Sequence, residues 1–210
     1  MELLLVGASG LVGGEVLKQA LADPRVAHVV APGRRPLPVH PRLEAPIFDF
    51  DSLTGDEPFW RGNAVICTLG TTIKTAGSRE AFARVDHDYP LAVAKAMHAR
   101  GTKIFVLNSA IGADARSPFF YSRVKGRLEA DLTAIGFSSL SLVRPGLIGG
   151  ERVERRRGEA VAGRILEAVG PILPRRWRVN PAPVIARVLL RCALSAAAGV
   201  HIIGSEELTA

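Results

Sequence analysis

The chain has 210 residues, 48% of them apolar and 22% charged, and a formal net charge of +7. This length suits one α/β domain with a full core and is short for two, so we expect a single domain over residues 1–210. No apolar run approaches the ~20 residues that a membrane span needs. Because Glu2 stands where a signal peptide carries basic residues, we expect a cytoplasmic protein without a membrane anchor.

The sulfur-containing and charged residues argue against several kinds of site. Cys67 and Cys192 lie far apart without a CxxC motif, and the five histidines show no metal-ligand spacing, so we expect neither a disulfide framework nor a metal site. The positive charge favours an anionic partner. The densest arginine cluster, Arg152–Arg164, is interrupted by glutamates and lacks interleaved aromatic residues. That mixture is typical of a solvated surface and argues against nucleic acid binding.

The first fourteen residues carry the pattern around which the fold is predicted. Leu3–Val6 is an apolar run of the kind that a strand buried on both faces needs, and an apolar helical pattern begins at Val12. Glycines recur between them at every third position, as in the turn of a dinucleotide-binding βαβ unit, although ordinary α/β loops also contain such glycines. The helix N-terminus would offer free N–H groups to phosphates. The residues expected at the pyrophosphate are Gly7, Ser9, Gly10, Leu11, Val12 and Gly13.

The second strand is expected at Val26–Ala31, and two arginines follow it, Arg34 and Arg35. NAD-specific folds place an acidic residue near this point to hold the ribose 2′-hydroxyl. None stands between His28 and Leu43. Because guanidinium groups bind phosphate bidentately, the arginine pair favours NADP(H) as the cofactor over the alternative of a solvated basic turn.

A proline-rich stretch up to Glu44 predicts no regular element, and Ala45–Phe50 predicts the third strand. Asp49 at its end could accept from the adenine amino group or cap the next short helix, and we favour the adenine contact. Ala64–Cys67 predicts the fourth strand. The residues expected to line the cofactor after these two strands are Asp49, Phe50, Thr68, Leu69 and Gly70.

A helical region is expected from about Ser78 to Arg100, with Pro90 inside it. Proline costs ~3 kcal/mol in a helix interior, so the helix either restarts near Asp88 or kinks there. The fifth strand, expected at Lys103–Leu107, leads into Asn108 and Ser109.

A second informative stretch surrounds Tyr121. Ser117 suits an N-cap and Pro118 the first helical position, so a helix is expected from here to Gly136. Tyr121 and Lys125 are four residues apart and share one helix face. A nearby ammonium lowers the pKa of a tyrosine from its ordinary ~10 and suits it to acid–base chemistry. The alternative is a half-buried tyrosine beside a surface lysine.

The last third of the chain is expected to close the cofactor site. Ser138–Arg144 predicts the sixth strand, and the backbone of the turn after it, at Pro145, Gly146 and Leu147, can hold the nicotinamide carboxamide. Beyond Gly150 we expect a small substrate-side portion over 151–198, with helices near Glu159–Val169 and from Pro183, and then an edge strand at Val200–Ile203. The predicted architecture is an α/β, doubly wound Rossmann fold with a mostly parallel sheet and this small C-terminal helical extension.

On these residues the chain resembles the short-chain dehydrogenases/reductases of the atypical, extended-like kind. More closely, it is similar to the Tat-interacting-protein (CC3-like) oxidoreductase group and its bacterial counterparts, and the resemblance covers nearly the whole chain. The motifs that carry it are Gly7-x-x-Gly10-x-x-Gly13, Gly33-Arg34-Arg35, Cys67–Thr72, Val85-Asp86-His87-Asp88-Tyr89, Ser109, Tyr121-x-x-x-Lys125-Gly126 and Arg144-Pro145-Gly146.

The resemblance implies a role for each catalytic position. Tyr121 would be the general acid/base, Lys125 would bind the nicotinamide ribose and tune Tyr121, and Ser109 would hydrogen-bond the reacting carbonyl or alcohol. The arginine pair would hold the 2′-phosphate of NADPH. One departure is Asn108, where the family's pattern has a serine, so the support of the site is expected to differ.

The sequence therefore predicts an NADP(H)-dependent oxidoreductase that acts on a small carbonyl or alcohol. Two alternatives stay open: an NADPH-binding redox-sensing regulatory protein with little or no turnover, and an enzyme like a nucleotide-sugar epimerase or dehydratase. A regulatory protein partner is implied by the family resemblance alone.

Overall fold

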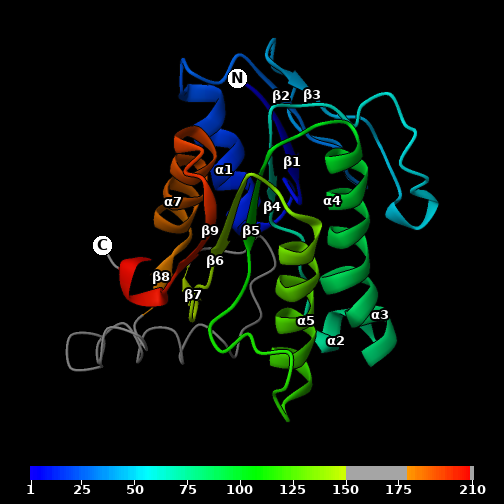
Figure 1. Ribbon diagram of the computed structural model, residues 1–210. Helices are drawn as coiled ribbons and strands as arrows, with labels where there is room; N and C mark the ends of the chain where they lie inside the picture. Colours follow the sequence, from blue (N-terminus) through cyan, green and yellow to red (C-terminus); the bar gives the residue numbers. More distant parts are fainter. Residues whose placement is uncertain (150–178, 209–210) are drawn as a thin grey trace.

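The computed structural model describes residues 1–149 and 179–208 (Figure 1). A seven-stranded sheet lies at its centre, and every neighbouring pair of strands in it is parallel. In spatial order the strands are β3 (Leu43–Glu44), β2 (His28–Val30), β1 (Glu2–Val6), β4 (Ala64–Cys67), β5 (Ile104–Asn108), β6 (Ser139–Val143) and β9 (Gly199–Ile203). The strand order reverses between β1 and β4, which is where doubly wound folds bind their ligands. The predicted fold class is confirmed.

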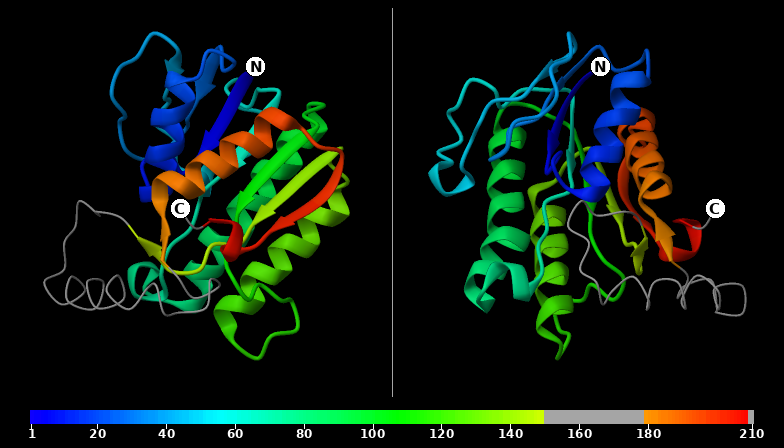
Figure 2. Two further views of the ribbon diagram at one scale, coloured as in Figure 1. Left: turned by 90° about the vertical axis from the view of Figure 1, so that its left-hand side faces the viewer. Right: turned by 180° about the vertical axis from the view of Figure 1, so that it is seen from behind.

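Helices cover both faces of the sheet. On one face lie α1 (Leu11–Ala22) and α7 (Ala182–Ser195); on the other lie α4 (Tyr89–Ala99) and α5 (Phe120–Ile135) (Figure 1). The side views show the same three layers (Figure 2). Successive residues of β1 join opposite cores, Leu3 and Leu5 facing α1 and α7 and Leu4 facing α4. A strand buried on both faces must be apolar throughout, which explains the unbroken run in this strand.

The shorter elements complete the described chain. They are the 3₁₀ turns η1 (Phe50–Ser52) and η5 (Ser205–Leu208), the helices α2 (Ile73–Ala76) and α3 (Arg79–Ala83), the π-helical turn η2 (Arg84–Asp88), and a two-stranded sheet of β7 (Ile148–Gly149) with β8 (Asn180–Pro181). Within residues 1–149 and 179–208, no helix is both long enough and apolar enough to cross a membrane.

The third strand is not where the sequence predicts it. Strand β3 lies at Leu43–Glu44, inside the stretch expected to be irregular, and the expected strand at 45–50 contributes only a single bridge, between Gly33 and Ile47. Pro46 stands in that segment and has no N–H to donate to a neighbouring strand. The expected strand therefore gives way to η1 at Phe50.

The expected helix over 78–100 continues through Pro90 by changing its hydrogen-bond pattern. The Tyr89 N–H bonds the Arg84 carbonyl, five residues back, and α4 then begins with Pro90 in its first turn. Pro90 has no N–H to donate to a carbonyl of the preceding turn, so the regular pattern of bonds is interrupted at this position. The sequence left open whether the helix restarts or kinks near Asp88, and the structure shows the π-helical turn η2 at this point.

Other boundaries shift by a few residues. Helix α5 begins at Phe120, with the Ser117 hydroxyl accepting from the Phe119 N–H, and it ends at Gly136 in the left-handed region (φ 84°). The edge strand near the C-terminus is confirmed as β9. The expected helix near Glu159–Val169 and most of the expected C-terminal portion lie outside the described residues.

The glycine turn after β1 brings three backbone segments unusually close. Gly7 has φ +91°, and a Cβ added to it would lie 2.7 Å from Thr68 Oγ1. A Cβ on Gly13 would lie 2.1 Å from the Gly7 carbonyl oxygen, far inside van der Waals contact. Gly10 is the N-cap of α1, and no side chain caps that helix. The turn, the helix and the end of β4 therefore pack together only because Gly7 and Gly13 lack side chains.

This close approach gives a test with a neighbouring control. Gly13→Ala should lower the free energy of unfolding by about 1–3 kcal/mol or more, because the methyl group overlaps backbone that cannot move freely. In Gly14→Ala the new Cβ would lie 3.6 Å from the Ala8 carbonyl oxygen, an ordinary contact. That variant should be stabilised by about 0.5–1 kcal/mol through helix propensity. Urea unfolding followed by circular dichroism measures both, and equal effects would contradict the packing described.

Candidate active site and dinucleotide cleft

A cavity of about 550 Å³ opens at the carboxyl ends of β1 and β2, beside the point where the strand order reverses. It gathers residues that the sequence predicts for the cofactor from four separate segments: Gly7, Ser9, Arg34, Arg35, Asp49, Phe50 and Leu69. A larger hollow of about 690 Å³ lies between α1 and α7 and contains none of the predicted site residues. The smaller cavity is therefore the candidate cofactor cleft.

The two predicted phosphate-binding arginines differ in their surroundings. Arg35 Nη2 donates to the Ser9 carbonyl (3.1 Å) and to the Ser9 hydroxyl (3.3 Å), so this guanidinium folds over the glycine turn. Arg34 also lines the cleft and is exposed. Arg35 is thus fixed against the segment expected to hold the pyrophosphate, whereas Arg34 extends from the rim of the cleft.

The N-terminal turn of α1 adjoins the same cavity. Because no side chain caps this helix, its first N–H groups, those of Leu11, Val12 and Gly13, remain available to an anion. Val12 and Gly13 are themselves buried. Their predicted contact is therefore one that only backbone groups could make.

The far end of the cleft is aromatic and acidic. Phe50 and Tyr89 lie 5.7 Å apart between ring centroids, and both line the cavity. Asp49 Oδ1 accepts from the Asp51 N–H, so it caps η1, which is the alternative to an adenine contact. The Tyr89 hydroxyl donates to Asp51, and burial together with that carboxylate raises the pKa of Tyr89 to about 12. An adenine contact of Asp49 stays a prediction for its second carboxylate oxygen.

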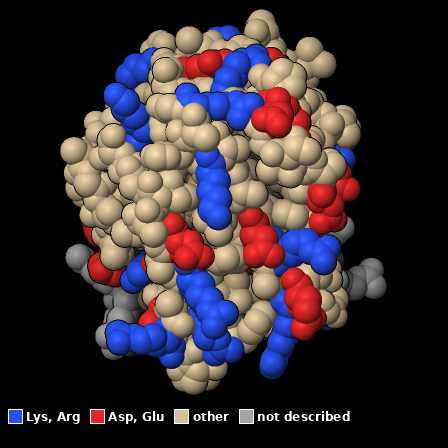
Figure 3. Space-filling view, turned by 45° about the vertical axis from the view of Figure 1, so that its right-hand side comes forward, with Lys and Arg blue, Asp and Glu red and all other residues tan. Residues whose placement is uncertain are grey.

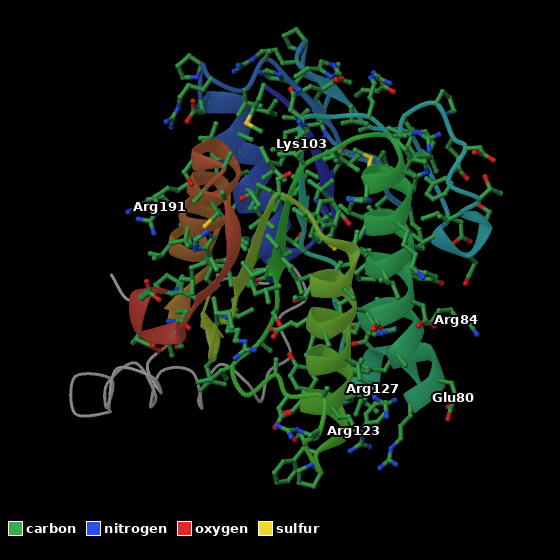
Figure 4. All side chains as sticks on the ribbon, viewed as in Figure 1. Glu80, Arg84, Lys103, Arg123, Arg127 and Arg191 are labelled. Atoms are coloured by element: carbon green, nitrogen blue, oxygen red, sulfur yellow. The ribbon has the colours of Figure 1, made fainter. Side chains whose placement is uncertain are left out.

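The predicted catalytic helix carries Tyr121 and Lys125 one turn apart on one face of α5. Lys125 is no surface lysine: its side chain is 4% exposed, and its Nζ lies 2.7 Å from Asp86 Oδ1. Elsewhere on α5, Arg127 is exposed, and Arg123 folds back to donate to the Ser117 and Pro118 carbonyls (Figure 4). Tyr121 is 42% exposed, and its ring packs on Phe82 at 5.7 Å between centroids.

The charges near Tyr121 do not lower the pKa of its phenol. Burial of its inner face raises that pKa; the Lys125 ammonium lowers it and the Asp86 carboxylate raises it again. The net direction is upward, opposite to the direction expected from a tyrosine–lysine pair alone. Asp86 itself is buried, and burial raises the pKa of its carboxyl group while Lys125 lowers it.

The structure brings Ser109 to a different partner from the expected one. Its hydroxyl donates to Glu129 Oε1 (2.5 Å), and that carboxylate is also bound by the Arg144 guanidinium. Ser109 is 5% exposed. Glu129 lies one turn beyond Lys125 on α5, so the hydroxyl is engaged deeper along the helix than the phenol of Tyr121. A contact of Ser109 with substrate stays a prediction.

The turn after β6 is likewise already bonded to protein groups. Gly146 N–H donates to Asn180 Oδ1, and the Leu147 carbonyl accepts from Asn180 N–H, both at 2.7 Å. The Pro145 carbonyl accepts from Ile111 N–H. The Gly146 N–H therefore already has a partner, whereas each of these carbonyls keeps a second lone pair. A contact of this turn with a nicotinamide carboxamide stays a prediction.

Sequence reasoning missed three residues that organise the site: Asp86, Glu129 and Asn180. A signal existed for the first two. Asp86 stands four residues after Phe82 on the apolar face of its helix, and Glu129 continues the Tyr121–Lys125 stripe by one turn. A carboxylate on an apolar face needs a buried cationic partner. Asn180 is fully buried and carried no such pattern.

The outer surface of the α4 and α5 layer shows both signs of charge. Lys and Arg side chains are interspersed with Asp and Glu across this face (Figure 3). It therefore lacks the continuous basic surface that commonly tracks a nucleic acid backbone.

Comparison with known proteins identifies relatives along nearly the whole chain. The mitochondrial protein fmp52 of Emericella nidulans is 35% identical over 217 residues, covering 97% of this chain and 92% of the relative. HTATIP2 of Rattus norvegicus is 35% identical over 206 residues, covering 94% and 83%. The UDP-glucuronic acid 4-epimerase of Bacillus cereus, solved in complex with NAD, has a TM-score of 0.71 at 14% identity over 97% of this chain and 78% of that chain. At that identity the likeness shows the fold alone. No protein-family profile matches.

One expectation is overturned by these relatives. The fmp52 proteins are named mitochondrial, which contradicts the cytoplasmic location expected from the sequence.

The engagement of Ser109 generates a test of its own. Ser109→Ala should lower the free energy of unfolding by about 1–3 kcal/mol, because it removes a buried hydrogen bond to a charged acceptor. Ser139 on β6 is the control: it is 2% exposed, and its hydroxyl has no partner among the described residues. Ser139→Ala should therefore be neutral or stabilising. If denaturant unfolding gives the two variants the same stability, the Ser109–Glu129 bond is not formed.

Proposed function

This chain belongs to the family of fmp52 and HTATIP2, a group of atypical short-chain dehydrogenases/reductases, and from this premise we propose that it is an NADP(H)-dependent oxidoreductase acting on a small carbonyl or alcohol. Tyr121 is its proton donor and acceptor, and Lys125 supports it. The structural neighbour solved with NAD supports a nicotinamide dinucleotide as the cofactor. The arginine pair at the rim of the cleft favours the phosphorylated form.

One observation carries this proposal: the turn after β4 joins the cleft to the Tyr121–Lys125 helix. Leu69 lines the cavity, and a Cβ added to its neighbour Gly70 would lie 3.7 Å from Lys125 Nζ and 3.4 Å from Asp86 Oδ1. A dinucleotide whose phosphates lie at the glycine turn can therefore extend along this segment towards Lys125. The missing side chain at Gly70 keeps the approach open.

When bound, a reduced nicotinamide dinucleotide supplies hydride to the carbonyl carbon. The protein's own part is proton transfer and charge control. The Tyr121 phenol, which keeps its proton at neutral pH, donates to the carbonyl oxygen as negative charge develops there. Because Tyr121 is 42% exposed, the phenolate then regains a proton from water.

A second candidate function is supported by the engagement of Ser109. While the Ser109 hydroxyl donates its proton to Glu129, it cannot donate to a substrate carbonyl, which supports an NADPH-binding redox sensor with little turnover. An epimerase-like enzyme is also compatible with the fold shared with the UDP-glucuronic acid 4-epimerase. Stoichiometry separates the three. An oxidoreductase consumes NADPH with a carbonyl, a sensor binds it unchanged, and an epimerase converts a nucleotide sugar without net oxidation.

Removing the phenolic hydroxyl tests the proposed chemistry. Tyr121→Phe should keep the NADPH dissociation constant within about twofold and lower kcat by about 10²–10⁴-fold, the usual contribution of a positioned general acid. Fluorescence titration and a screen of small aldehydes and ketones measure the two quantities. Unchanged turnover of every accepted carbonyl would exclude Tyr121 as the proton donor.

Separate arginine variants test the cofactor preference. Arg34→Ala should raise the dissociation constant of NADPH by about tenfold or more and leave that of NADH nearly unchanged, because only NADPH carries the 2′-phosphate. Arg35→Ala should weaken the binding of both cofactors, since it also removes the bonds from Arg35 to Ser9 in the glycine turn. Calorimetric titration of each variant with each cofactor measures this. If Arg34→Ala lowers the affinity for NADPH and for NADH equally, the 2′-phosphate binds elsewhere.

A further inference from the structure

Asp86 is a carboxylate held rigidly inside the apolar layer beneath α5. Its side chain is 1% exposed, and both of its oxygens are bonded: Oδ1 to Lys125 Nζ at 2.7 Å, and Oδ2 to the Thr71 N–H at 2.8 Å. The Lys125 side chain is itself 4% exposed. An ion pair so far from solvent is screened little, so its two charges act strongly on any titratable neighbour.

The π-helical turn carries this carboxylate towards Lys125. Asp86 lies in the middle of η2, whose Tyr89 N–H bonds back to Arg84. Two neighbours on the same turn have outer positions instead: His87 bonds Asp88 and also Asp131 on α5. Of the two acidic residues on this turn, Asp86 is therefore buried against Lys125 and Asp88 lies at the surface.

No other acidic group among the described residues competes for this position. From β4, the Cys67 thiol also adjoins the pair, and burial raises its pKa to about 11, so it is uncharged at neutral pH. From α3, Arg79 lies over the Phe120 ring and Glu80 points outward (Figure 4). On α5 itself, Glu129 is bound by Arg144 and Ser109. Asp86 is thus the carboxylate that faces Lys125.

We propose that Asp86 is a positioning residue that holds the Lys125 ammonium beneath Tyr121 and offsets its charge, so that the ammonium does little to favour the phenolate and the site works in the direction of carbonyl reduction. The inference rests on the proposed function for its direction of turnover. Its electrostatic part concerns the protein alone and can be measured without cofactor or substrate.

The direction follows from the proton balance. In reduction, a bound dinucleotide would supply hydride, which carries both electrons, to the carbonyl carbon, while the Tyr121 O–H bond breaks and the carbonyl oxygen gains that proton. Water then returns a proton to the phenolate. In oxidation, Tyr121 must first lose its proton before it can accept one from an alcohol. A neutral Lys125–Asp86 pair gives little help with that loss, so oxidation requires alkaline pH.

The test is a titration of Tyr121 in the protein without ligands. The chain has two tyrosines, so a Tyr89→Phe background leaves only Tyr121, whose phenolate is followed by ultraviolet absorbance. In that background Asp86→Asn should lower the pKa of Tyr121 by about one to three units, because the ammonium then acts without its counter-charge. Asp88→Asn, an isosteric change two residues away on the same turn, should leave that pKa unchanged.

A second variant guards against a failure to fold, since an unpaired buried charge destabilises a protein strongly. Asp86→Asn combined with Lys125→Met removes both charges, and the pKa of Tyr121 should return to within about half a unit of the background protein. A fall of the pKa in this double variant as large as in Asp86→Asn overturns the proposal. So does an unmoved pKa in Asp86→Asn.

The pH dependence of turnover separates this inference from the proposed function. Asp86→Asn should shift the alkaline fall of carbonyl reduction to lower pH by the same number of units as the titration, and it should raise alcohol oxidation near neutrality. If the pKa shifts as expected but no carbonyl is reduced by any variant, the role of Asp86 stands and the proposed enzyme activity fails. If carbonyls are reduced and the pKa does not move, the inference about Asp86 fails alone.

Discussion

The structure depends on a backbone contact that only glycine permits. Helix α1 approaches the turn after β1 so closely that a single methyl group on Gly13 would overlap the Gly7 carbonyl. That approach places the uncapped helix N-terminus at the reversal of strand order. It also presses the turn against Thr68 at the end of β4. The cleft, the arginines at its rim and the route towards Lys125 all begin from this one contact.

The cofactor cleft and the Tyr121–Lys125 region differ in how their positive charges are balanced. The cleft side presents positive groups, Arg34, Arg35 and free N–H groups of α1, to a ligand that would bring negative charge. The chemical side starts with a buried ammonium that no ligand is needed to neutralise, because Asp86 already does so. On the proposed function, a dinucleotide in the cleft would meet positive charge at its phosphates and a pair of opposite charges, Lys125 and Asp86, near its reactive ring.

The sequence predicted the parts of the fold that rest on local patterns. The strands buried on both faces, β4 and β1 among them, follow from short apolar runs, and the glycine turn follows from spacing. The third strand could not be placed because its short pairing is set by neighbours rather than by its own residues, and Pro46 interrupts the better apolar run.

Within the site, residue types and spacing revealed Tyr121 and Lys125 but not the carboxylate that pairs with Lys125. That carboxylate belongs to Asp86, which lies in the π-helical turn η2. Similarly, the partner of Ser109 is Glu129, which α5 supplies from a distant part of the chain. Both contacts join residues twenty or more positions apart, beyond the reach of periodicity.

Pro90 interrupts the hydrogen-bond pattern of the helix directly after the turn that carries Asp86. In a regular α-helix the residue at 90 would donate to the carbonyl of residue 86, and proline has no N–H with which to do so. The backbone is thereby released at the position where the helix widens. The widened turn that carries Asp86 to Lys125 thus lies directly before a residue that contributes no functional group, only the absence of one N–H.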